Sequence, residues 1–83
     1  MTREALRAAI DAALRSVAPE SDPARLADDA DLRETLDLDS MDFLSFVVAL
    51  HRATGVDIPE RDYARLATLE GAVQYLGPRV PSG

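Results

Sequence analysis

Residues 36–55 read LDLDSMDFLSFVVALHRATG, a short polar approach that runs directly into the most strongly helical stretch of the chain. Apolar side chains in this stretch recur at spacings of three and four, which places one stripe along a helix: Phe43, Phe46, Val47 and Leu50. Asp39 is a favourable N-cap, and Gly55 stands where a left-handed C-cap ends a helix. The stretch therefore predicts an amphipathic helix over residues 40–54.

A second long amphipathic helix is predicted upstream, over residues 3–17. Its apolar residues follow the same spacing, and Thr2 is its expected N-cap. The stripe consists of Leu6, Ala9, Ile10, Ala13, Leu14 and Val17. Pro19 and the Asp22-Pro23 pair end this helix and open a polar loop that continues to Asp39.

Two shorter helices are predicted downstream of Gly55. Pro59 occupies a favoured first helical position and begins a brief helix through about Leu66. Thr68 caps a last helix, which Gly77-Pro78 ends. The apolar face of that last helix holds Leu69, Ala72, Val73 and Leu76.

No segment alternates apolar and polar residues over the length of a strand, so the predicted class is all-α, with three main helices plus one short helix. Long loops in compact domains are usually functional or anchored to the core. A single helical turn is possible within this loop. Four leucines are its expected anchors: Leu26, Leu32, Leu36 and Leu38. Residues 1–78 are predicted to form one domain, and residues 79–83 a disordered tail.

Composition restricts the possible functions. The chain has 83 residues, no cysteine, and 15 acidic against nine basic residues, for a net charge of −6. A domain of this size has little room for a deep active site, and its charge repels nucleic acid and anionic membranes. Without cysteine there is neither a disulfide nor a thiolate zinc site. With no long apolar run and no signal peptide, we expect a soluble, cytoplasmic protein that does not insert into membranes.

Ser40 is the residue most suited to carry chemistry, because it lies where the polar loop meets the longest apolar helix. Its hydroxyl is expected to be exposed, and a phosphate joined to it meets the favourable dipole of a helix N-terminus. Repulsion from Asp39 and Asp42 would keep an attached group mobile. Capping alone is the alternative explanation of a serine at this place, and on local physics it is the commoner one.

The motif Asp39-Ser40-Met41-Asp42 resembles the Asp-Ser-Leu-Asp/Glu attachment motif of acyl carrier proteins, with Met41 in place of the usual leucine. The resemblance extends over about residues 3–77. It includes the approach to the serine over residues 36–40, the link Val56-Asp57-Ile58-Pro59, and the start of the last helix over residues 68–73. It implies a four-helix bundle of the acyl carrier type that acts as a free-standing carrier.

The resemblance also implies a cofactor and partners. A phosphopantetheinyl transferase would attach 4'-phosphopantetheine from coenzyme A to Ser40, and the terminal thiol of the arm would hold acyl or aminoacyl groups as thioesters. The partners would be loading ligases, synthases and transferases of lipid, polyketide or nonribosomal peptide biosynthesis. The chain itself would have no catalytic residue, bind no metal and act as a monomer.

The helix over residues 40–54 is implied to be the partner-recognition surface. The residues expected to face partners are Asp39, Met41, Asp42, Leu44 and Val48. For Leu44 and Val48, packing in the core is an equally good alternative.

This helix departs from fatty-acid-type carriers, which usually show several glutamates where the chain has Ser45, His51 and Arg52. The departure favours a specialised pathway, with drift on a solvated face as the alternative. His51 cannot activate Ser40, because eleven helical residues separate the two by about 16 Å.

Other functional classes have weaker support. A helical interaction domain without a prosthetic group is the main rival. A hydrolase lacks a base beside Ser40, and a DNA-binding helix is disfavoured by the acidic charge. The carboxylates of Asp28, Asp29 and Asp31 lack the spacing of a calcium loop, so a solvated loop is the better interpretation.

Overall fold

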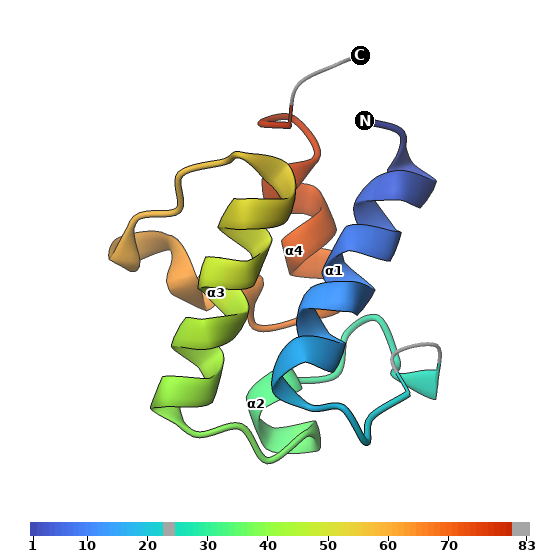
Figure 1. The fold of residues 1–83 in the computed structure, drawn as a ribbon, viewed down its shortest axis with the longest axis vertical. Coiled ribbons are helices and arrows are strands. Elements are labelled where there is room, and N and C mark those ends of the chain that lie inside the picture. The colour runs from blue at the N-terminus through green and yellow to red at the C-terminus, as the bar shows by residue number, and fades with distance from the viewer. Residues whose placement is uncertain (23–24, 81–83) are drawn as a thin grey trace.

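The structure, a computed structural model, describes residues 1–22 and 25–80. Its elements, in chain order, are α1 (Arg3–Val17), α2 (Leu32–Thr35), α3 (Ser40–Thr54), the 3₁₀-helix η2 (Glu60–Leu66) and α4 (Leu69–Leu76). No strand occurs within these residues, so the predicted all-α class is confirmed. Figure 1 shows α1, α3 and α4 as the body of a bundle, with α2 at the end where α3 begins.

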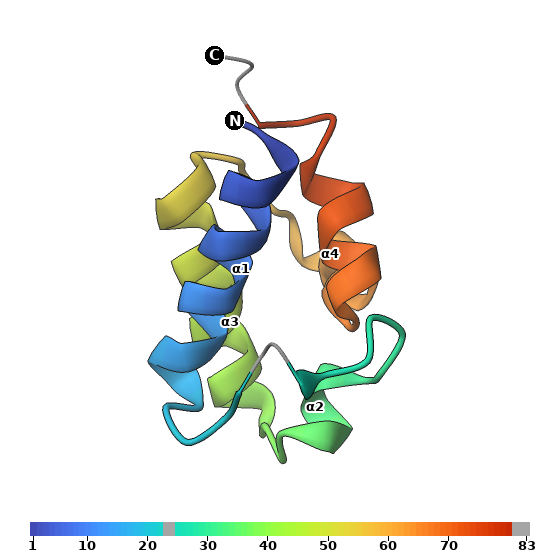
Figure 2. The same ribbon diagram turned by 90° about the vertical axis from the view of Figure 1, so that its right-hand side faces the viewer.

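The core lies between the three longer helices. The most extensive helix pairing is that of α1 with α3, and α4 packs against both α1 and η2. Figure 2 shows α4 beside the α1 and α3 pair, with α2 below them. The side chains buried at the centre of this packing include Ile10, Leu14, Phe46, Leu50, Leu69 and Leu76. Each such side chain stabilises the fold by about 1.5–3 kcal/mol through removal of apolar surface from water.

The predicted helix ends are confirmed by their hydrogen bonds. The Thr2 hydroxyl accepts from the Ala5 N–H at 3.0 Å, and the Thr68 hydroxyl accepts from the Gly71 N–H at 2.9 Å. Gly55 ends α3 with a φ of 74°, a left-handed conformation that favours glycine.

The first loop is anchored as the leucine pattern predicted. Leu32 and Leu38 are buried, whereas Leu26 and Leu36 are half-buried against the core. Two backbone hydrogen bonds also tie the loop to the start of α4: Leu32 N–H donates to the Ala67 carbonyl at 2.8 Å, and Glu70 N–H donates to the Asp28 carbonyl at 2.9 Å. The expected single helical turn is α2. Pro23, which the sequence places at the loop entrance, lies outside the described residues.

Two details differ from the sequence-based expectations. Pro59 precedes the short helix as its N-cap rather than beginning it, and that helix is of the 3₁₀ type. Arg79, predicted as part of a disordered tail, is in contact with α4: its guanidinium lies 4.0 Å from the centre of the Tyr75 ring and donates to the Tyr75 carbonyl at 2.7 Å. Val80 packs against the core. The other three tail residues, 81–83, lie outside the described part of the chain.

Candidate functional site

Ser40 is the first residue of α3, and its side chain is exposed. The capping of this helix is performed by its neighbours, because the Asp39 carboxylate accepts from the Asp42 N–H at 2.8 Å. The Asp42 carboxylate accepts in return from the Asp39 N–H at 3.4 Å, which completes a capping box. Among the described residues, the Ser40 hydroxyl makes no capping bond, so capping does not explain a serine at this position.

A tight turn between α2 and α3 places Ser40 at the end of the bundle. Asp37 adopts a φ of 54° there, a left-handed conformation that aspartate tolerates better than most residues. Leu38 follows with its side chain buried, and its N–H donates to the Arg33 carbonyl at 2.8 Å. The turn thereby fixes the backbone of α2 relative to the start of α3.

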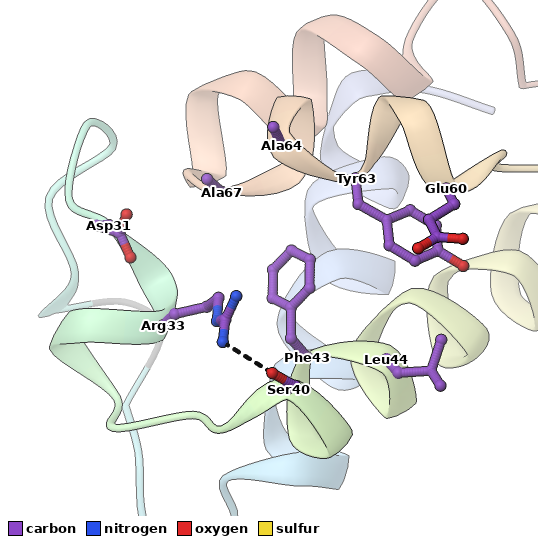
Figure 3. Close-up of a pocket in the computed structure, with 9 residues that line it drawn as sticks. All are labelled: Asp31, Arg33, Ser40, Phe43, Leu44, Glu60, Tyr63, Ala64 and Ala67. Atoms are coloured by element: carbon purple, nitrogen blue, oxygen red, sulfur yellow. Dashed lines mark hydrogen bonds between the residues drawn. The ribbon is translucent and has the colours of Figure 1, made fainter.

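Arg33 is a residue of this site that sequence reasoning missed. Its Nη2 donates to the Ser40 Oγ at 3.3 Å, and its guanidinium carbon lies 5.6 Å from the centre of the Phe43 ring. Figure 3 shows the side chain extending from α2 toward the start of α3. Nothing in the spacing of residues 33 and 40 indicates this contact, which depends on how the turn orients α2.

An open groove of about 640 Å³ begins at this pair and runs between α3 and η2. Apolar side chains form much of its wall, with Phe43 and Leu44 on the α3 side and Tyr63 and Ala64 on the η2 side. Ser40 and Arg33 lie at its edge (Figure 3). The groove can therefore accept a slender, partly apolar group attached at the serine.

The outward face of α3 carries the apolar stripe that the sequence proposed for partners. Met41 is 79% exposed, Leu44 48% and Val48 41%. The alternative that Leu44 and Val48 pack in the core is therefore wrong, and both side chains lie on the surface. A continuous exposed apolar stripe on a small domain is typical of a binding surface.

Among the remaining candidate residues, Asp31 lines the groove at Ser40, whereas His51 and Asp28 do not. His51 is on the last turn of α3, where its Nδ1 lies 2.9 Å from the Val56 carbonyl oxygen and 3.5 Å from an Asp57 carboxylate oxygen. The side chain of Asp28 accepts from Arg7 at 3.2 Å, and Asp31 caps α2. In residues 1–22 and 25–80, no three acidic or histidine side chains gather in a way that could hold a metal ion.

Within the described ranges, no helix is both long enough and apolar enough to cross a bilayer.

The arrangement around Ser40 fits a phosphate-linked prosthetic group. The hydroxyl is exposed and unused by the helix cap, a guanidinium lies within hydrogen-bond distance, and a groove leads away from it. Guanidinium groups bind phosphate through several directed donors.

Comparison with known proteins gives the same indication. A family model described as "Phosphopantetheine attachment site" matches residues 5–76. An acyl carrier protein of Rubrobacter xylanophilus is 33% identical over 66% of this chain and 68% of its own, and one of Lactobacillus johnsonii is 34% identical over 66% and 69%. "Polyketide-8 synthase acyl carrier protein 2" of Streptomyces avermitilis is 36% identical over 66% of this chain and 63% of its own.

A match of this extent, over an all-helical fold with an exposed serine at the start of α3, shows the family. The chain belongs to the acyl carrier proteins, which are not enzymes but carriers with covalently attached 4'-phosphopantetheine.

Proposed function

We propose that Ser40 is the attachment residue and that the loaded arm delivers acyl or aminoacyl groups as thioesters to biosynthetic enzymes. The observation that carries this proposal is the exposed Ser40 hydroxyl, which the capping box of Asp39 and Asp42 leaves unused. During attachment, a bond forms between the Ser40 Oγ and a phosphorus of coenzyme A. The pyrophosphate bond breaks, the nucleotide leaves, and the serine proton passes to a base of the transferase.

The bound group supplies a terminal thiol, which the cysteine-free chain lacks. The residues of the chain hold the attachment point at the end of a rigid helix and keep it exposed. Capping by Asp39 stabilises the first turn of α3, so that the serine stays at a defined place while the arm moves.

We propose the α3 face as the docking surface for the transferase and for later partners. Its apolar part is Met41, Leu44 and Val48, and its acidic part is Asp39 and Asp42 beside the serine. Apolar contacts supply affinity in such an interface, whereas the flanking charges guide encounter with a basic partner. A monomer fits this function because it leaves the whole face free.

Three residues spread along α3 distinguish the chain from a housekeeping fatty acid carrier. Ser45, His51 and Arg52 are exposed, so an approaching partner meets neutral and basic groups there instead of glutamates. We propose a dedicated partner in polyketide, nonribosomal peptide or specialised lipid assembly. A test is malonyl loading and elongation of the holo protein by fatty acid synthase enzymes, which should be poor and should improve when the three residues are changed together to Glu. Loading and elongation equal to those of a fatty acid carrier assayed in parallel would contradict a specialised partner.

The attachment itself is tested by incubating the protein with a broad-specificity transferase and coenzyme A. Ser40→Ala should remain folded, by circular dichroism, and acquire no mass. Ser16→Ala, which alters an exposed serine on α1 outside the proposed docking face, is the matched control and should be modified like wild type. An unmodified wild type would instead support the rival, an interaction domain without a prosthetic group.

A further inference from the structure

The surroundings of Ser40 are strongly acidic. Asp39 and Asp42 flank it in the chain, and the exposed Asp37 lies in the preceding turn. A phosphodiester on Ser40 adds a further negative charge, and carboxylates beside a phosphate are repulsive. Arg33 is the one cationic side chain, in the described part of the molecule, that hydrogen-bonds to the Ser40 hydroxyl.

The backbone of Arg33 is held on both sides. Asp31 caps α2 by accepting from the Glu34 N–H at 2.9 Å, and the fully buried Leu32 anchors the turn to the core. The Arg33 carbonyl accepts from the Leu38 N–H, which closes the connection to α3. The ring of Phe43 flanks the guanidinium. These contacts fix the backbone from which the Arg33 side chain extends, and the Phe43 ring packs against its guanidinium beside Ser40.

The Arg33 guanidinium has N–H donors that no ion pair among the described residues engages. Arg7 pairs with carboxylates of Asp11 and Asp28, but among the described residues no carboxylate lies within 4.0 Å of Arg33. Its recorded hydrogen bond is the one to Ser40 Oγ, the same oxygen that attachment converts into a phosphate ester. A phosphate joined there places its charge beside a guanidinium that no ion pair already satisfies.

We propose that Arg33 is a positioning residue that binds the phosphodiester of the holo protein and offsets the repulsion from Asp39 and Asp42. It thereby holds the root of the arm at the α2 side of Ser40, where the groove lined by Phe43 begins. This proposal rests on the proposed attachment at Ser40. Lysine at residue 33 supplies the charge without the planar set of donors, so it replaces arginine only in part.

The experiment compares apo and holo forms of wild type, Arg33→Gln and Arg33→Lys. Arg61→Gln is the matched control, because it removes the same charge from another exposed position, on η2. Two quantities are measured: the ³¹P chemical shift of the phosphodiester at low and high salt, and the change in melting temperature when each apo protein becomes holo. The first reports the surroundings of the phosphate directly, and a merely structural arginine would not alter its dependence on salt.

At low salt the ³¹P shift of Arg33→Gln should differ from that of wild type, with Arg33→Lys between them and Arg61→Gln unchanged. The difference should shrink in about 1 M salt, where the Debye length is about 3 Å. Conversion from apo to holo should raise the melting temperature less, or lower it more, in Arg33→Gln than in wild type. The difference between the two proteins should be about 1–8 °C, the range expected of one exposed ion pair in a small domain.

Equal ³¹P shifts in wild type and Arg33→Gln at low salt, together with equal apo-to-holo melting changes, would overturn the role of Arg33. A wild type that acquires no arm would instead refute the attachment at Ser40, so the two failures are distinguishable.

Discussion

Leu32 anchors α2, and its truncation to alanine tests how the fold supports the site. The side chain is fully buried, and α2 has only four residues, too few to persist as a helix without tertiary packing. Truncation of a buried leucine costs about 2–5 kcal/mol. Because the site lies at the end of the bundle, where neighbours can partly close the cavity, we expect the lower half of that range, about 2–3 kcal/mol.

The assay is urea unfolding followed by circular dichroism, with Leu36→Ala as the matched control. Leu36 lies on the same loop but is only half-buried, so its truncation should cost less than that of Leu32, about 1 kcal/mol. Hydrogen exchange at the Leu32 amide, which donates to the Ala67 carbonyl, should also accelerate in Leu32→Ala. A loss of stability no larger than that of Leu36→Ala, with unchanged exchange at this amide, would refute the claim that Leu32 anchors α2.

Three further predictions concern the cap, the tyrosine and the docking face. Asp39→Ala should lower the free energy of unfolding by about 0.5–2 kcal/mol, because the Asp42 N–H loses its acceptor; an unchanged urea midpoint would contradict this. Burial, and then the hydrogen bond to Asp62, raise the pKa of Tyr75 above 10.0, so its proton is lost more easily from the unfolded chain. Stability should therefore fall as the pH rises from about 10 toward the folded pKa, and unfolding measured across that range should show a smaller fall in Tyr75→Phe. Leu44→Asp should leave thermal stability nearly unchanged, because the side chain is 48% exposed, but should slow arm attachment by the transferase; unaltered kinetics would mean that docking lies elsewhere.

The helices and their ends could be predicted because they depend on neighbours in sequence. The apolar stripe over residues 40–54, the cap at Asp39 and the left-handed Gly55 are all local signals, and each is present in the structure. A helix start at Ser40 was recognisable from its cap in the same way, whereas the proposal that Ser40 carries a group came from the resemblance of residues 39–42 to the acyl carrier motif.

Features that depend on tertiary approach could not be predicted. The Arg33 side chain reaches Ser40 because the turn between α2 and α3 has a positive φ at Asp37. A glycine at this position would indicate a positive φ from the sequence, whereas an aspartate does not. Gly71 reads as an ordinary helical residue, yet a Cβ there would clash with the Arg65 carbonyl oxygen, so its small size lets α4 approach η2. Tyr75 is almost fully buried, because its hydroxyl donates to the Asp62 carboxylate on η2.

The most direct test of the central claim is fragment mass spectrometry of the wild-type chain after reaction with a phosphopantetheinyl transferase and coenzyme A. We expect a single phosphopantetheine, located on the fragment that contains Ser40 and lost when the phosphoester is cleaved. A chain that remains unmodified, or one that carries the group on any other residue, would contradict it.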